Sequence, residues 1–336
     1  MPRQKVLLVT RKYPPIQGGM EQYAADLYTY WSRLDDVTLL ANPAGNRALP
    51  RFLARASFEI ARSARRYDRV HLADALLAVL IPAIRSVSKA RISVTVHGLD
   101  ITYDRYGYQA VVPRLVARAD RVICVSTYTR AECARRGVAA DRLAVVPNAI
   151  DLGTLDAAQP QGGGDIRARR GIPLDKPVLF SINRLVKRKG NAWFVREFMP
   201  KLRDRYSYVI AGSGPERETI ERAVAELGLE GSVFLLGRID DDERLFWYRN
   251  ADAYVMPNVT VPNDPEGYGI VCLEASVYGL PVYTTGIEGI ADQMDYCHPL
   301  EELSAGLRPR LGGAELERHR ERVSWERVIE AFRGKL

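Results

Sequence analysis

The sequence is poor in the residues that mark metal sites, disulfide scaffolds and membrane spans. Its 336 residues include only four cysteines, and their spacing matches no metal or redox motif. We therefore expect buried free thiols in a reducing compartment. The longest hydrophobic run, Leu72–Ile84, contains Asp74 and is too short to cross a bilayer. The apolar run Val6–Thr10 is too short for a signal peptide, so we expect a cytoplasmic protein.

The length and the charge distribution of the chain indicate how many domains it has and what one of them binds. A chain of 336 residues is too long for one ordinary hydrophobic core, so two domains are expected. Residues 1–150 carry 23 Lys and Arg against 12 Asp and Glu, a net charge of +11. Residues 151–336 carry 25 against 29, a net charge of −4. Solubility explains a general excess of one sign, but an excess confined to one half also indicates an anionic partner for that half.

Short β-rich runs alternate with helical patterns along the whole chain, as is typical of doubly wound parallel sheets of the α/β class. The expected strands are 5–10, 37–41, 69–72, 92–97, 121–126, 143–147, 178–183, 208–212, 233–237, 253–256 and 282–285. Residues 156–165 have the composition of a flexible linker. We therefore predict two Rossmann-like domains that face a cleft. Their limits are 1–155 and 176–318, with a linker at 156–175 and a helix in 319–336 that packs back on the first domain.

Polar or glycine-rich segments follow these expected strands repeatedly. They are residues 14–21, 97–100, 183–190, 212–216 and 266–274. Because ligands bind beyond the carboxyl ends of the strands in open parallel sheets, five such segments on matching sheet edges predict a ligand site.

The most informative of these segments is 266–274, in which two carboxylates lie eight positions apart. Gly267, Tyr268 and Gly269 form a turn after Glu266, and Glu274 falls just over one turn into an expected helix. Helix N-termini attract phosphate, and carboxylates accept hydrogen bonds from hydroxyl groups, so the segment suits a nucleotide sugar. The alternative, that acidic residues merely favour a helix N-terminus, explains Glu266 better than Glu274.

Two further segments have ordinary structural explanations beside a functional one. A tight turn that opens a helix accounts for Gly18 and Gly19, and no complete G-x-G-x-x-G motif is present. His97 is equally consistent with a strand-end histidine bound to backbone and with a site residue.

The basic segment after strand 178–183 also has two interpretations. Arg184 and Lys189 could form a solvated face, but a diphosphate leaving group needs fixed positive charge, which these two residues can supply. Lys187 and Arg188 are expected to be solvated. The acidic run 240–242 is better explained as a helix cap than as a metal site, and no metal site is predicted.

Taken together, these segments resemble the retaining glycosyltransferases of family 4, which have the GT-B fold. The resemblance runs from Leu7 to about Ile290 and includes the helix with Trp325. The Glu266/Glu274 pair around Gly-Tyr-Gly is its most specific element. Two departures concern Asn183, where the family usually has glycine, and residues 290–300, which lack the usual Asp-Gly…Gly segment.

The resemblance implies roles for individual residues. Glu274 would bind the ribose hydroxyls, Glu266 the hydroxyls of the donor sugar, and His97 the same sugar near its reacting carbon. Arg184 and Lys189 would hold the diphosphate and, with His97 and Glu266, form the catalytic set. Other positions implied at the donor are Gly18, Gly19, Gly212, Gly214, Arg238, Ile239, Gly267, Tyr268, Gly269, Ile270 and Val271. Such enzymes look metal-independent, so no cofactor is expected beyond a UDP- or GDP-linked sugar.

Residues 51–67 predict an amphipathic helix with an unusual basic face. Its apolar face consists of Phe52, Leu53, Ala56, Ile60, Ala64 and Tyr67, and its basic face of Arg51, Arg55, Arg62, Arg65 and Arg66 with Phe58 among them. An ordinary surface helix explains the apolar face but not five arginines around an aromatic ring. Contact with an anionic membrane explains these arginines and the ring between them. The expected contact residues are Arg55, Phe58, Arg62 and Arg66.

We therefore predict a cytoplasmic glycosyltransferase, peripherally bound to the inner membrane, that transfers a sugar to a lipid-linked, lipopolysaccharide or polysaccharide acceptor. One rival is another GT-B enzyme, such as a sugar-nucleotide epimerase. A second rival is a basic nucleic-acid-binding protein, although basic patches interleaved with stacking aromatic residues are missing and no nucleic-acid partner is expected.

Overall fold

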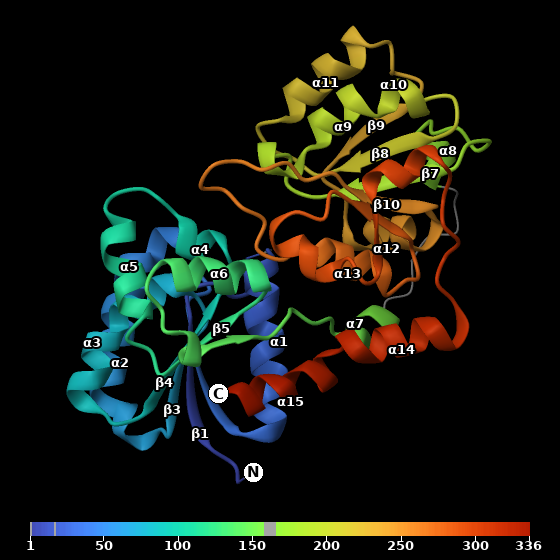
Figure 1. Cartoon of the computed structure of the whole chain (residues 1–336). Helices are drawn as coiled ribbons and strands as arrows, with labels where there is room; N and C mark the ends of the chain where they lie inside the picture. Colours follow the sequence, from blue (N-terminus) through green and yellow to red (C-terminus); the bar gives the residue numbers. More distant parts are fainter. Residues whose placement is uncertain (1, 17, 158–165) are drawn as a thin grey trace. The chain divides into compact units, whose positions relative to one another are not determined.

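The computed structural model describes residues 2–16, 18–157 and 166–336, and the chain divides into two compact units (Figure 1). The first unit comprises Met1–Ala149, Asn263–Tyr268 and Val323–Leu336, and the second comprises Ile150–Pro262 and Gly269–Arg322. Each unit has a six-stranded sheet whose paired strands are parallel. The predicted doubly wound α/β class with two Rossmann-like domains is thereby confirmed.

The first unit has the strand order β2-β1-β3-β4-β5-β6. Its elements are β1 (Lys5–Thr10), α1 (Gly19–Leu34), β2 (Asp36–Ala41), α2 (Leu49–Ser63), β3 (Arg69–Leu72), α3 (Ile81–Val87), β4 (Arg91–Val96), α4 (Leu99–Thr102), α5 (Tyr108–Val116), β5 (Arg121–Cys124), α6 (Thr127–Arg135), β6 (Leu143–Val145) and α15 (Trp325–Lys335). Short 3₁₀ turns lie at Asn46–Ala48, Ala64–Arg66, Ala75–Leu80 and Ala140–Arg142.

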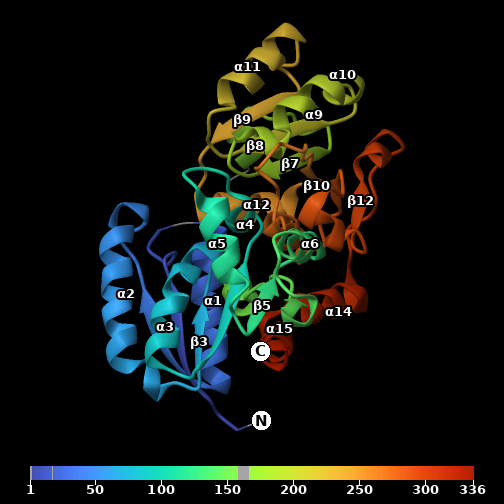
Figure 2. The ribbon, with the colours of Figure 1, turned by 60° about the vertical axis from the view of Figure 1, so that its left-hand side comes forward.

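Helices cover both faces of this sheet, which explains why β1 and β4 are buried at every position after the first. On one face, residues of α2, α3 and α5 pack against alternate strand residues such as Leu7 and Val70; Figure 2 shows α2 and α3 side by side there. On the other face, α1 and α15 pack against Val6 and Leu8. The last helix, expected on the N-terminal domain, therefore lies in the first unit, where Trp325 is buried.

The second unit has the strand order β12-β11-β10-β7-β8-β9. Its elements are α7 (Leu152–Ala157), α8 (Ile166–Arg169), β7 (Val178–Ile182), α9 (Asn191–Glu197), α10 (Met199–Leu202), β8 (Ser207–Ala211), α11 (Arg217–Glu226), β9 (Val233–Gly237), α12 (Asp241–Asn250), β10 (Ala253–Met256), α13 (Ile270–Ser276), β11 (Val282–Thr284), β12 (Cys297–Pro299) and α14 (Gly313–Val323). Short 3₁₀ turns lie at Lys187–Lys189, Glu288–Gln293 and Leu300–Ser304.

Two hydrophobic layers also enclose the second sheet. Residues of α9, α10 and α11 pack on one face, and residues of α12 and α13 pack on the other. Ile166 and Ile172, which fall within the predicted linker, are buried in the second layer. Residues 158–165 of that linker lie outside the described residues.

The strand orders place a topological switch point in each sheet. In the first sheet the order reverses between β1 and β3, and in the second it reverses between β7 and β10. Ligands of open parallel sheets bind at such points, beyond the carboxyl ends of the strands. The segments after β1, β3, β7 and β10 are therefore the places in which to look for functional side chains.

Three other sequence expectations can be compared with the structure. All four cysteines are buried and free, as expected. Strand β12 was not predicted, because three residues that end in Pro299 give too short a pattern, and it occupies part of the atypical 290–300 segment. Among the residues with described placement, no helix combines the length and hydropathy needed to span a bilayer.

Candidate functional site

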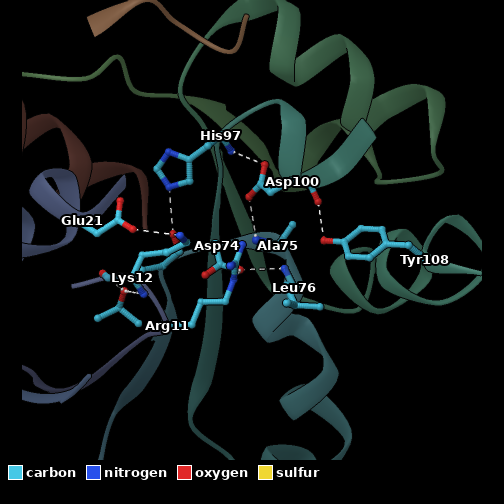
Figure 3. Close-up of polar contacts among 11 residues, drawn as sticks. Arg11, Lys12, Glu21, Asp74, Ala75, Leu76, His97, Asp100 and Tyr108 are labelled. Carbon is cyan, nitrogen blue, oxygen red and sulfur yellow. Dashed lines mark hydrogen bonds and ion pairs between the residues drawn. The ribbon is translucent and has the colours of Figure 1, made fainter. Parts of the chain in front are cut away.

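Seven polar side chains gather beyond the ends of β1, β3 and β4 in the first unit (Figure 3). We call this group the strand-end cluster; its members are Arg11, Lys12, Glu21, Asp74, His97, Asp100 and Tyr108. They come from both sides of the switch point, and residues as far apart as Arg11 and Asp74 meet there.

His97 is held in one orientation by two hydrogen bonds. Its backbone N–H donates to Oδ1 of Asp100 at 2.7 Å, and its Nε2 lies 2.9 Å from the carbonyl oxygen of Ala73 (Figure 3). Because a carbonyl only accepts, Nε2 carries a proton, and in the tautomer protonated at Nε2 alone Nδ1 is a hydrogen-bond acceptor. The ring also makes an edge contact with Tyr23, with centroids 4.8 Å apart. The geometry suits a side chain that accepts a hydrogen bond from a hydroxyl group.

Asp100 and Asp74 fix the backbone around His97. The second oxygen of Asp100 accepts a hydrogen bond from the backbone N–H of Ala75 at 2.9 Å, so this carboxylate joins the end of β4 to the turn after β3. Burial raises the pKa of Asp100. Asp74 accepts from Nε of Arg11 at 3.0 Å and from the backbone N–H of Leu76 at 3.0 Å.

A second ion pair in the strand-end cluster explains one of the predicted glycines. Nζ of Lys12 lies 3.0 Å from Oε1 of Glu21, whose side chain is buried at the start of α1. A Cβ atom on Gly18 would lie 2.4 Å from Oε2 of Glu21. Gly18 therefore makes room for this pair, while Gly18 and Gly19 are both exposed at the N-terminus of α1.

The Gly-Tyr-Gly turn has a packing function in the first unit. A Cβ atom on Gly267 would lie 1.8 Å from the carbonyl oxygen of His97, and one on Gly98 would lie 2.7 Å from Cα of Gly267. Oγ of Ser126 donates a hydrogen bond to the carbonyl oxygen of Gly267 at 2.8 Å. Both glycines are thus required by a backbone contact beside His97, and Tyr268 is buried next to them.

In the second unit, Glu274 lies on α13, after β10. The hydroxyl of Tyr248 donates to its Oε2 at 2.8 Å. Burial and the Glu274 carboxylate raise the pKa of Tyr248, so its hydroxyl keeps the proton that it donates. Burial opposes the charge of Arg244, but Glu274 and neighbouring groups hold its pKa above the usual value. The carboxylate is partly exposed, with one oxygen oriented by Tyr248.

The loops after β7 and β8 are shaped by three close backbone approaches. A Cβ atom on Gly190 would lie 1.7 Å from the carbonyl oxygen of Pro257, and those on Gly212 and Gly214 would lie 1.9 Å and 2.3 Å from carbonyl oxygens of the β7 loop. The side-chain amides of Asn183 and Asn191 bind each other at 3.3 Å. This pair accounts for asparagine at position 183.

The basic segment of this loop differs from the prediction at one residue. Arg184 and Lys187 are exposed and Lys189 is 7% exposed. The prediction that Arg188 is solvated is wrong, because its side chain is only 8% exposed. Residues Lys187–Lys189 form a 3₁₀ turn, in which successive side chains point in different directions, so a basic run does not form one solvated face.

The structure brings the predicted site residues together in two groups. Arg184 and Lys189 follow β7 and Glu274 follows β10, which is the neighbouring strand. Ile270 and Val271 begin α13 beside Glu274, whereas Arg238 and Ile239 follow β9 at the sheet margin. Glu266, with Gly267 and Tyr268, belongs to the first unit together with His97. The contacts of both groups of residues with a donor remain a prediction.

Sequence reasoning missed most of the strand-end cluster, and Tyr248 and Arg244 as well. One signal was present: Asp74 interrupts an apolar run directly after a strand, where a buried charge needs a reason. The acidic run 240–242 caps α12 as expected, since Oδ1 of Asp240 accepts from the backbone N–H of Glu243 at 2.8 Å. Over the described ranges, no three His, Cys, Asp or Glu side chains are grouped as a metal site would require.

Two family models match the two halves of the chain. The model described as Glycosyltransferase Family 4 matches residues 17–154, and the model described as Glycosyl transferases group 1 matches residues 164–295.

Characterised relatives match over most of the chain. The GDP-mannose-dependent alpha-(1-6)-phosphatidylinositol monomannoside mannosyltransferase of Mycolicibacterium smegmatis is 30% identical over 305 residues, which cover 82% of this chain and 79% of that protein. The 2-deoxystreptamine glucosyltransferase of Streptomyces kanamyceticus is 30% identical over 270 residues, covering 74% and 67%.

Solved structures share the fold at lower identity. Anabaena HepE in complex with UDP-glucose has a TM-score of 0.68 at 19% identity, with 90% of this chain and 88% of that chain covered. The sucrose-phosphate synthase of Thermosynechococcus elongatus has a TM-score of 0.75 at 20% identity, with 99% and 98% covered.

Proposed function

This chain belongs to glycosyltransferase family 4, and we propose that it transfers a hexose, with retention of configuration, from a nucleoside diphosphate sugar to a lipid-linked acceptor. The observation that carries the proposal is the Glu274 carboxylate. Its Oε2 is oriented by the Tyr248 hydroxyl at 2.8 Å, and in the described part of the chain no group donates to Oε1. A carboxylate held in this way can accept hydrogen bonds from the two adjacent hydroxyls of a ribose.

The leaving diphosphate would be bound by the basic loop after β7. Arg184 is exposed and can bind two phosphate oxygens, whereas Lys189 is mostly buried and supplies a fixed charge. Negative charge develops on the diphosphate as the glycosidic bond breaks, so these cations stabilise the transition state more than the ground state. In a front-face reaction the leaving phosphate itself assists deprotonation of the acceptor hydroxyl.

His97 would bind the transferred sugar. With Nε2–H bound to the carbonyl oxygen of Ala73, the neutral ring accepts a hydrogen bond from a sugar hydroxyl through Nδ1. In this role His97 orients the sugar and transfers no proton in the reaction. Glu266 would accept from other hydroxyls of the same sugar.

GDP-mannose is the first donor to test, since several relatives are named as GDP-mannose-dependent mannosyltransferases that act on phosphatidylinositol mannosides. A UDP-linked hexose is the alternative, because the related HepE structure contains UDP-glucose. Calorimetric titration with GDP and UDP identifies the base. Transfer from the matching sugar nucleotides to phosphatidylinositol mannoside in detergent micelles then identifies the sugar.

The expected product is a glycolipid with the anomeric configuration of the donor, determined by nuclear magnetic resonance. A product of inverted configuration would contradict retention. Release of a free or isomerised sugar at the same rate with and without acceptor would instead support the epimerase alternative. Binding of a random oligonucleotide without affinity for GDP or UDP would support the nucleic-acid alternative.

A lipid-linked acceptor requires access to a membrane surface, and we propose α2 as the contact. Phe52, Ala56 and Ile60 are buried against the first sheet, whereas Phe58 is 64% exposed among the arginines. A large exposed ring surrounded by cations suits the boundary between lipid headgroups and acyl chains. Each basic residue near an anionic surface contributes about 1 kcal/mol to binding.

Co-sedimentation with vesicles tests this contact. Wild-type protein should bind vesicles that contain phosphatidylglycerol more tightly than vesicles of phosphatidylcholine alone. The triple variant Arg55→Ala, Arg62→Ala, Arg66→Ala should lose most of the difference. A matched triple substitution of exposed arginines on or near α5 and α6, at Arg114, Arg118 and Arg130, should retain it. Equal binding to both kinds of vesicle by the wild type would refute the membrane contact.

A further inference from the structure

A cavity of about 810 Å³ lies at the opposite edge of the first sheet, where the strands begin. This edge is at the end of the first unit marked N in Figure 1, away from the strand-end cluster. Five cationic side chains and one carboxylate line the cavity; they are Arg65, Arg69, Arg85, Lys89, Arg91 and Asp68. The lining residues therefore carry a large excess of positive charge.

Arg69 is the buried member of this set. Its side chain is 3% exposed, and its Nη2 donates a hydrogen bond at 3.0 Å to an oxygen of Leu336, the last residue of the sequence. Nε and Nη1 have no hydrogen-bond partner among the described residues, and none of the carboxylates described forms an ion pair with this guanidinium. Burial and the nearby Arg91 lower the pKa of Arg69 to about 10. Buried donors without a hydrogen-bond partner cost free energy of folding, which an acceptor bound in the cavity would recover.

The side-chain carboxylates nearest the cavity are bound directly to other groups. Oδ2 of Asp68 accepts a hydrogen bond from the backbone N–H of Lys5 at 2.8 Å, and Asp120 pairs with Arg85 at 2.6 Å. Lys89 and Arg91 are exposed and, within the described ranges, form no ion pair. Within the described ranges, Arg69, Lys89 and Arg91 thus form no direct ion pair with an Asp or Glu side chain.

We propose that this cavity binds a phosphate group. Phosphate oxygens accept several hydrogen bonds at once, and guanidinium groups match their geometry better than single-point cations do. Because the cavity lies at the amino ends of the strands, it is separate from the edge at which the sugar nucleotide is proposed to bind. The phosphate can come from a soluble phosphate compound or from the headgroup of an anionic phospholipid, and the experiment distinguishes these sources.

The first measurement is a titration with inorganic pyrophosphate at constant ionic strength. Lys89→Gln combined with Arg91→Gln should weaken one class of binding site by about tenfold or more, the loss expected for one charge-assisted hydrogen bond. Lys201→Gln combined with Arg222→Gln removes the same charge from exposed positions of the second unit and should leave binding unchanged. Both pairs of residues lie outside the proposed donor site, so transfer activity should persist in both variants. Equal pyrophosphate affinities of the two double variants would overturn the proposal.

Arg69→Met is an independent variant, because it removes the buried charge and keeps an unbranched side chain of moderate length. It should abolish the same class of site while hydrogen exchange in β3 and β4 stays close to wild type, since removal of two buried donors without partners offsets loss of one hydrogen bond. Undiminished pyrophosphate binding in a folded Arg69→Met variant would refute the role of this cavity.

Vesicles identify the source of the phosphate. Phosphatidylcholine vesicles with phosphatidic acid should be compared with vesicles of phosphatidylcholine alone, using the Lys89/Arg91 variant, in which the arginines of α2 are intact. A headgroup ligand predicts binding to the phosphatidic acid vesicles that the variant loses and that free pyrophosphate reduces by competing for the same cavity. A soluble ligand predicts the same vesicle binding in wild type and variant, with the difference confined to pyrophosphate.

Discussion

The two units hold their strand-end segments in different ways. In the first unit, charged side chains bind one another or backbone: Arg11 pairs with Asp74, Lys12 pairs with Glu21, and Asp100 accepts from the backbone N–H groups of His97 and Ala75. In the second unit, glycines let backbone segments approach closely, as at Gly190 and Gly212. The first arrangement is fixed by electrostatics and hydrogen bonds, and the second by steric fit.

The same fold can therefore fix the segments at its ligand-binding edge by two physical means. Charge pairs tolerate small backbone shifts, because a hydrogen bond weakens gradually with distance. A close backbone approach tolerates none, because atoms cannot overlap. Substitution of the glycines at Gly190 and Gly212 should therefore act mainly on stability, and substitutions in the strand-end cluster mainly on the chemistry of His97.

The largest effect is expected for Gly190→Ala in the second unit. The added Cβ would lie 1.7 Å from the carbonyl oxygen of Pro257, and φ of 68° is unfavourable for alanine. We expect the local stability of β7 and β10 to fall by about 3 kcal/mol, measured by hydrogen exchange.

Gly228→Ala is the matched control for Gly190→Ala. Its φ is 60°, but a Cβ there meets no atom within 4 Å. It should reduce stability by only about 1 kcal/mol, the contribution of the backbone conformation alone. Equal losses in the two variants would show that steric fit around Gly190 has no special importance.

A smaller loss of folding stability is expected at acid pH from protonation of His71, which is fully buried in the first unit. Its Nδ1 and Nε2 bind the hydroxyls of Ser93 and Thr95, and burial lowers the pKa of His71 to about 3. In the unfolded chain the pKa is about 6.5, so the unfolded state binds a proton that the folded state does not bind. Stability is therefore fully present above pH 6.5 and is lost as the pH falls toward 3.

This loss should reach about 2 kcal/mol at pH 5, at roughly 1.4 kcal/mol per pH unit. Hydrogen exchange in β3 and β4, corrected for the intrinsic effect of pH, measures it. His71→Gln should flatten the dependence on pH whatever it does to stability at pH 7. An unchanged dependence in this variant would mean that other groups control the acid lability of the first unit.

The strands and several loops could be predicted from the sequence, because their signals are local. Runs such as Val6–Val9 and the glycines after several strands identify the sheet edges without any knowledge of tertiary contacts. The pairing of Arg11 with Asp74 could not be predicted in this way, since the two residues are 63 positions apart. The burial of Arg188 could not be predicted either, because the direction of one side chain in a 3₁₀ turn depends on the residues that pack around it.

The third prediction concerns donor binding by the second unit. Glu274→Gln keeps the size of the side chain but removes a charged acceptor, so the affinity for the nucleotide should fall about tenfold. Calorimetry with GDP and UDP measures this change. Tyr248→Phe removes the hydroxyl that orients Oε2 and should cost about threefold, because Glu274 keeps its charge.

Glu226→Gln serves as the control for Glu274→Gln, since Glu226 pairs with Arg196 at 2.8 Å on the exposed surface. It should leave nucleotide affinity unchanged. By contrast, Glu266→Ala should reduce turnover more than nucleotide affinity, because its proposed partner is the sugar. Unaltered nucleotide affinity in Glu274→Gln would contradict the assignment on which the proposed function rests.

An effect smaller than that of Glu274→Gln is expected for Asp100→Asn in the first unit, and it tests whether this residue positions His97. An asparagine oxygen can accept from only one of the two backbone N–H groups, of His97 and Ala75, that the carboxylate now binds. The amide NH₂ then faces the other N–H, and the end of β4 shifts slightly. We expect kcat to fall about fivefold while nucleotide affinity is unchanged, because the second unit is intact. A purely structural role predicts instead reduced hydrogen-exchange protection throughout β4 with equal losses in kcat and nucleotide affinity. That outcome would place Asp100 among the groups that stabilise the sheet rather than among those that set the position of His97.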